Sequence, residues 1–171
     1  MTQGDLVGRM IGAATLKIDT FEDVEADATA TGQAAVVVIL VALASGIGSI
    51  DDGLVVALLS PVAALVGWLV WAGVTYLIGD KLLGGTATWG ELLRTLGFAQ
   101  SPGVLYLLGI LPLVGFFVRL ILPFWMLLAG IIAIRQALDF GTGKAILTAV
   151  LGWLVLFLST VLLGGSALLG A

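Results

Sequence analysis

Apolar runs of about 20 residues constrain this chain more than any other feature of its sequence. Residues 30–50 and 54–79 are two such runs, and neither contains a charged residue. A helix rises 1.5 Å per residue, so about 20 residues cross a hydrocarbon core of about 30 Å. Hydrophobic residues make up 60% of the chain and charged residues only 11%, against about a quarter charged in globular proteins. The chain is therefore predicted to be an integral membrane protein.

Five spans account for most of the 171 residues, which favours a single membrane domain over residues 1–171. The expected fold class is all-α, with spans bent at Pro61 and Pro123, because proline removes a helical hydrogen bond. The third span is expected to be short and interrupted by Pro112. The predicted spans are about 30–50, 54–79, 102–117, 118–138 and 145–169.

Residues 4–28 precede the first span and are predicted to form an interfacial segment, with no removable signal peptide. Val7, Ile11 and Ile18 recur at helical spacing, which is typical of an amphipathic helix at a membrane surface. A frayed terminus is the alternative. Five acidic residues follow between Asp19 and Asp27, and they are either a solvated acidic face or a patch that binds a partner or a cation.

A short helix is predicted between the second and third spans. Thr88 and Glu91 have the spacing of a capping box, so the helix should begin at Trp89. It would place its leucines on one face and Arg94 away from them, which favours a helix lying along the cytoplasmic membrane surface. Asp51-Asp52-Gly53 is expected to connect the first two spans tightly.

The basic residues predict the orientation, because Lys and Arg are enriched in cytoplasmic loops. Five spans place six basic residues on one side and only Arg119 on the other. This asymmetry places the N-terminus in the cytoplasm and the C-terminus outside. The six residues are Arg9, Lys17, Lys81, Arg94, Arg135 and Lys144.

Composition excludes several chemistries. The chain has no Cys and no His, which removes disulfides, the usual zinc ligand sets and imidazole catalysis. Gly141 to Lys144 resembles the end of a phosphate-binding loop, but Leu138 and Ala145 occupy positions that require Gly and Ser or Thr. We therefore expect no enzyme, no catalytic residue, no cofactor, no metal and no nucleic acid partner.

Charged residues on the cytoplasmic side are the best candidates for a functional site. They could form an ion-pair or partner-binding cluster that locks the N-terminal segment onto the bundle. Snorkelling of Arg119 and Arg135 to the interface is the plainer interpretation of the two arginines. The candidate cluster is Glu22, Asp23, Asp27, Arg94, Arg135, Gln136 and Lys144.

Several short motifs together resemble the Yip family, small membrane proteins named for eukaryotic members that interact with Rab (Ypt) GTPases. The resemblance covers nearly the whole chain and is strongest to compact, prokaryotic-type members. It implies five spans with a cytoplasmic N-terminus, and GTPase interaction is expected from the resemblance alone. The motifs are Phe21-Glu22-Asp23-Val24 with Gln33-Ala34, Gly84 to Thr88 leading into Glu91-Leu92-Leu93-Arg94, Gly97-Phe98-Ala99 with Pro102, and Arg135 to Leu138 with Gly143-Lys144-Ala145.

Two functions follow as hypotheses. The first is a non-enzymatic scaffold, adaptor or membrane organiser in the cell membrane, with the lipid bilayer and either a homo-oligomer or another membrane protein as partners. The alternative is a small channel or transporter that uses the proline-bent helices with Arg119 or Arg135. An intramembrane enzyme is the third hypothesis, weakened by the absence of His and Cys.

Overall fold

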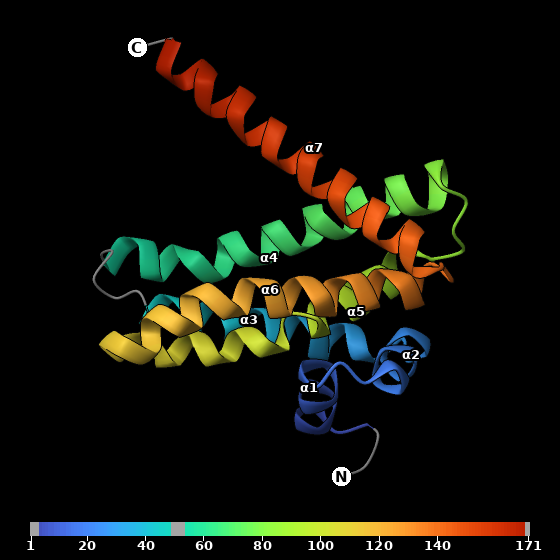
Figure 1. The fold of residues 1–171 in the computed structure, drawn as a ribbon, viewed down its shortest axis with the longest axis horizontal. Coiled ribbons are helices and arrows are strands. Elements are labelled where there is room, and N and C mark those ends of the chain that lie inside the picture. The colour runs from blue at the N-terminus through green and yellow to red at the C-terminus, as the bar shows by residue number, and fades with distance from the viewer. Residues whose placement is uncertain (1–3, 49–53, 170–171) are drawn as a thin grey trace.

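A computed structural model of the chain describes residues 4–48 and 54–169. Every element in this part is helical (Figure 1). The α-helices are α1 (Leu6–Ala14), α2 (Ile18–Ala26), α3 (Ala30–Gly48), α4 (Leu54–Tyr76), α5 (Trp89–Phe98), α6 (Pro112–Ala137) and α7 (Thr142–Leu169). A π-helix, η2 (Leu77–Leu82), continues α4, and a 3₁₀-helix, η3 (Ser101–Ile110), precedes α6.

Three segments are long and apolar enough to cross a membrane: Ala30–Gly48, Pro61–Leu82 and Leu113–Ala137. A shorter apolar helix covers Thr142–Leu156. This confirms the prediction of a helical membrane protein, while the count of five spans stays a prediction. The end of the first predicted span at residues 49–50 and the connection at residues 51–53 lie outside the described residues.

The predicted boundary between the third and fourth spans, at residues 117 and 118, is wrong. The chain turns at Leu111, and α6 then runs without a break from Pro112 to Ala137. Leu111 is extended, with φ −88° and ψ 118°, because a residue before proline avoids the helical region, and proline suits the first helical turn. What looked like an interruption inside a span is therefore the start of the next helix.

The capping box before α5 is confirmed. The Thr88 hydroxyl accepts from the Glu91 backbone N–H, and the Glu91 carboxylate accepts from the Thr88 N–H at 2.7 Å. Helix α5 packs among α2, α3, α4 and α6, and its position along a membrane surface stays a prediction. Arg94, expected to point away from the packed face, is itself buried.

Glycine permits this burial of α5. A Cβ added at Gly97 would lie 2.7 Å from the Ala34 Cβ on α3, so the two helices approach closely only because residue 97 has no side chain. Trp68 on α4 reaches the same helix and donates its indole N–H to the Leu93 carbonyl at 3.0 Å. Small residues at such contacts are typical of helix packing in membranes.

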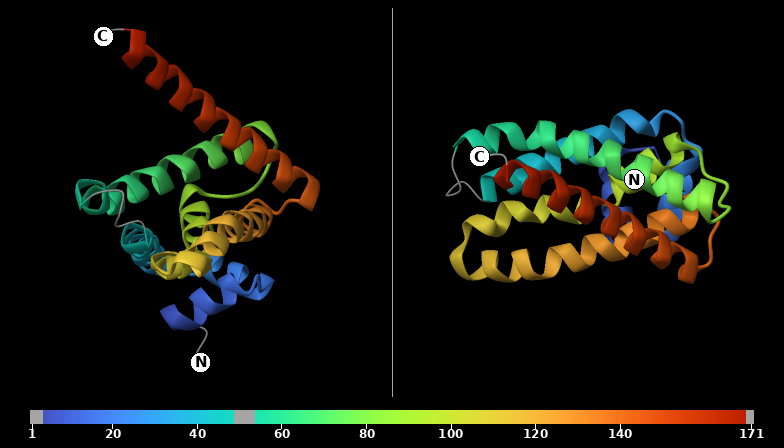
Figure 2. Two further views of the ribbon diagram at one scale, coloured as in Figure 1. Left: turned by 60° about the vertical axis from the view of Figure 1, so that its left-hand side comes forward. Right: turned by 90° about the horizontal axis from the view of Figure 1, so that it is seen from above.

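The long helices α3, α4 and α6 run roughly side by side with η3, whereas α1 and α2 lie at the edge of this bundle (Figures 1 and 2). Helix α1 runs across the direction of α6, and Trp125 of α6 donates to the Ala14 carbonyl at 2.7 Å. Helix α7 packs on α4, α6 and η2 near its start and then diverges from the bundle (Figure 2). One end of the bundle therefore gathers α2, α5 and the beginning of α7.

The α3–α5 contact gives a stability prediction. Gly97→Ala should lower the free energy of unfolding by about 1–3 kcal/mol, because overpacking a rigid contact forces the helices apart. Gly73→Ala in α4 is the matched control, since its added Cβ would meet no atom within 4 Å, and it should be neutral or stabilising by up to about 1 kcal/mol. Unfolding in detergent measures both, and equal effects would contradict the close approach.

Candidate functional site

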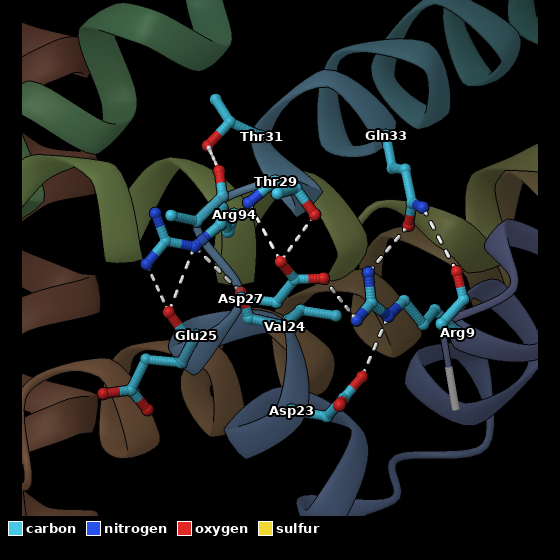
Figure 3. A network of polar contacts seen from close by, with 11 residues as sticks. Arg9, Asp23, Val24, Glu25, Asp27, Thr29, Thr31, Gln33 and Arg94 are labelled. Carbon is cyan, nitrogen blue, oxygen red and sulfur yellow. Dashed lines mark hydrogen bonds and ion pairs between the residues drawn. The ribbon is translucent and has the colours of Figure 1, made fainter. Parts of the chain in front are cut away.

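Arg9 of α1 is the centre of the most extensive polar network in the described part of the chain (Figure 3). Its Nε donates to Asp23 at 2.8 Å, and one Nη donates to Asp27 at 2.7 Å. The other Nη donates to the Gln33 side-chain carbonyl at 2.9 Å. The guanidinium side chain is only 4% exposed. One arginine therefore joins α1 to α2, to the α2–α3 connection and to α3.

Asp27 has a second role in the turn between α2 and α3. Its other oxygen accepts from the Thr29 N–H at 2.9 Å and from the Thr29 hydroxyl at 2.6 Å, an arrangement that fixes the backbone just before a helix start. These bonds from Thr29, and then those from Arg9, lower the pKa of Asp27 to about 2. The carboxylate stays ionised at all ordinary pH values.

Arg94 of α5 holds the other end of α2. Its Nε donates to the Val24 carbonyl at 2.8 Å, and both Nε and one Nη donate to the Glu25 carbonyl (Figure 3). The last carbonyls of a helix lack partners within the helix and carry partial negative charge. Arg94 therefore caps the C-terminus of α2, and it reaches the acidic segment through its backbone.

Carboxylates from three different segments gather around Glu25. Burial raises the pKa of Glu25 to about 7, with further contributions from the nearby charges of Glu91, Asp139 and Glu22, which outweigh the opposing effect of Arg94. Asp139 is fixed at the end of α6, where its carboxylate accepts from the Thr86 hydroxyl at 2.6 Å. We call these four residues the acidic face.

Among the remaining predicted cluster residues, only Gln136 bonds to the acidic segment in the described structure. Gln136 donates to the Glu22 carboxylate at 2.8 Å, which ties α6 to α2. Lys144 donates to the Leu83 carbonyl at 3.1 Å and lies over the Phe140 ring. The Arg135 side chain makes no hydrogen bond or ion pair with another described residue, so the joining of Arg135 to the acidic segment stays a prediction.

Sequence reasoning missed the residue at the centre of the network. Arg9 is separated from Asp23 by 14 residues and from Gln33 by 24, so no local spacing identifies the pairing. A signal did exist: Arg9 and Lys17 are the only basic residues before Lys81, and five acidic residues lie just after them. Glu25, Glu91 and Asp139 are far apart in the chain, and only the fold brings them together.

The chemistry available here is electrostatic. No group of three or more acidic side chains in the part that the structure describes could hold a metal ion. The two buried arginines have their donors directed at carboxylates, carbonyls and an amide, so their charge is used to fix α1 and α2. The acidic face is the part of the site whose charge is not balanced by a direct ion pair in the described structure.

The Arg9 network gives a prediction about the N-terminal segment. Arg9→Gln should weaken the docking of α1 by about 2 kcal/mol, because each hydrogen bond to a charged group contributes about 1.5–3 kcal/mol. Trypsin cleavage after Lys17, between α1 and α2, should then be faster by about 30-fold. Arg9→Lys is the control for charge. Its cleavage rate should lie between those of the wild type and Arg9→Gln, because an ammonium cannot reproduce the guanidinium fork. Unchanged cleavage in Arg9→Gln would contradict a docking role.

The raised pKa of Glu25 gives a pH prediction. The folded state holds a proton on Glu25 up to about pH 7, whereas the unfolded chain loses it near pH 4.5, so ionisation of Glu25 opposes folding as the pH rises. Glu25→Gln should therefore stabilise the protein increasingly from pH 4.5 to about 7, and by a constant amount above that range. Unfolding measured against pH tests this, and a pH-independent difference would contradict it.

Comparison with known proteins agrees with the helical membrane architecture. The Yip1 domain family matches residues 14–163, which cover the acidic segment, α5 and the end of α6 but not Arg9. No curated protein and no solved structure shows significant similarity to the chain. The Yip1 family is not an enzyme family. Because the match covers most of the chain, this protein belongs to the Yip1 domain family of membrane proteins.

Proposed function

We propose that this Yip1-family protein is a non-enzymatic scaffold, adaptor or membrane organiser of the cell membrane that acts through its cytoplasmic face. The observation that carries the proposal is the acidic face, which is held in place by Arg9 and Arg94. Two buried arginines fix α2, so Glu22 and Glu25 are held beside Glu91 and Asp139 as a defined surface. A surface of this charge fits a basic segment of another protein.

The proposed orientation keeps the N-terminus in the cytoplasm and the C-terminus outside, with five membrane-crossing segments. The charge asymmetry supports it, and so does membership in the family. Helix η3 is the shortest crossing segment, because ten residues at a 3₁₀ rise of about 2.0 Å reach about 20 Å. Helix α7 is longer than the hydrocarbon core requires, since 28 residues reach about 42 Å.

Helix α1 is proposed to lie at the cytoplasmic membrane interface. Its buried side carries Arg9, whereas Val7 is 52% exposed and Ile11 47% exposed. Gln33, in the first turn of α3, bonds both Arg9 and the Gly4 carbonyl, so α1 lies level with the start of a predicted span. Apolar side chains directed outward at that level favour contact with lipid rather than water.

The transport hypothesis gains less support. Arg119 is exposed and donates to the Gly48 carbonyl at 2.9 Å, at the C-terminus of α3. Arg135 is 16 residues further along the same helix, or about 24 Å. The two arginines that the hypothesis invoked therefore lie near opposite ends of α6, which is the arrangement expected of side chains at the two interfaces.

Site-specific photocrosslinking tests the cytoplasmic-face proposal. A photoreactive residue at Ala26, which is exposed on α2, should give discrete crosslinked products in cells. The variant Glu22→Gln with Glu91→Gln should lose most of them, because half of the acidic face is then neutral.

Asp19→Asn is the matched control, since it removes a carboxylate from the same helix at a position that is not among the neighbours affecting Glu25. It should leave the products in place. Products that survive neutralisation of Glu22 and Glu91 would contradict the acidic face as the binding surface. Solute flux in liposomes at a rate above protein-free vesicles would favour the transport hypothesis instead.

A further inference from the structure

A groove of about 220 Å³ lies where α7 diverges from α4 and α6. Its walls are apolar and come from all three helices. Glycine leaves it open at one point, because a Cβ at Gly130 would meet no atom within 4 Å. The lining residues are Trp71, Pro123, Met126, Leu127, Gly130, Ile131, Ile134 and Ala149.

The length of the groove along α6 matches one leaflet of a membrane. On α6 the lining residues extend from Pro123 to Ile134, which is about 16 Å of helix, and half of a hydrocarbon core is about 15 Å. They lie inside the apolar segment Leu113–Ala137. The solvent at this depth is the acyl chains of lipids, so an apolar groove there is in contact with hydrocarbon.

A cation whose side chain has no partner in the described residues directly follows the part of α6 that lines the groove. Arg135 is in the last turn of α6, four residues after Ile131, which lines the groove. The same side of α6 carries Phe124 and Leu128, and both are more than half exposed. Arg135 therefore follows a row of exposed apolar side chains that is suited to contact with lipid. Its side chain makes no hydrogen bond or ion pair within the described residues, and its guanidinium fork is suited to a phosphate.

We propose that the groove binds one acyl chain of an anionic phospholipid and that Arg135 holds the phosphate of the same lipid. The apolar walls select hydrocarbon, and the unpaired guanidinium selects a net negative headgroup. The site is separate from the acidic face. A second copy of this chain is the competing occupant of the groove. That alternative does not by itself supply an anionic group for Arg135.

Native mass spectrometry of the full chain in detergent tests the site. The probes are phosphatidylglycerol and phosphatidylcholine with identical acyl chains, added in equal amounts. The wild type should retain one tightly bound lipid with a preference for phosphatidylglycerol. Arg135→Gln should reduce that preference about fivefold, because one basic residue near a membrane surface contributes about 1 kcal/mol. Gly130→Leu should reduce the binding of both lipids, because it fills the groove.

Two variants control for unrelated effects. Arg119→Gln removes an arginine from the other end of α6, and Gly73→Leu adds the same side chain at an open glycine that does not line the groove. Both should bind lipid as the wild type does. An unchanged preference in Arg135→Gln, or unchanged retention in Gly130→Leu, would overturn the proposal. A dimer that disappears only in Gly130→Leu would also overturn it, in favour of a second copy.

Discussion

The hydrogen bonds of the buried Arg9 guanidinium determine where the first two helices lie. Burial of a cation costs several kcal/mol unless charges and hydrogen bonds compensate, and here two carboxylates and an amide supply the compensation. The result is a helix with its charge inside and its valine and isoleucine side chains outside. That arrangement is unfavourable in water and favourable against lipid, so the same network that fixes α1 also accounts for its exposed apolar side. Arg94 completes the docking by capping α2, and the acidic face follows from the resulting position of α2.

The rest of the bundle is held together by close packing of small residues. Buried alanines line the contacts of α3, α6 and α7, among them Ala34, Ala133 and Ala149. Gly79 and Gly103 leave room for Leu138 and Val41 respectively, each of which a Cβ would meet at less than 3 Å. Lipid tails are as apolar as leucine, so burial of apolar area gives little attraction between helices within the membrane, and dispersion at close approach contributes instead. This explains why bulky residues are exposed on the outside of the bundle while the interior is rich in alanine.

The sequence predicted features that depend on a few neighbouring residues and failed on those that depend on distant ones. The capping box at Thr88 and Glu91 is local, and it was found at the predicted position. Hydropathy could not place the turn at Leu111, because the residues on both sides of it are equally apolar and only Pro112 marks the helix start. The burial of Arg94 was missed for a related reason: periodicity identifies the apolar side of α5 but not the carbonyls of α2 that an arginine can satisfy. The sequence did indicate which residues carry charge, whereas the pairing of Arg9 required the fold.

The number of basic residues in the sequence is not the number of positive charges that the folded protein leaves available for binding. Six basic residues are predicted on the cytoplasmic side, yet within the described structure Arg9 and Arg94 are buried against protein acceptors, Lys144 bonds the Leu83 carbonyl and Lys81 pairs with Asp80. Orientation during insertion depends on the charges of the unfolded chain, so all six can contribute to it. Recognition of a lipid depends on the charges that the folded protein leaves free. Lys17 and Arg135 both meet that condition in the described structure, since no side-chain partner is found for either. Only Arg135 follows residues that line an apolar groove, which is why this one residue carries the lipid proposal.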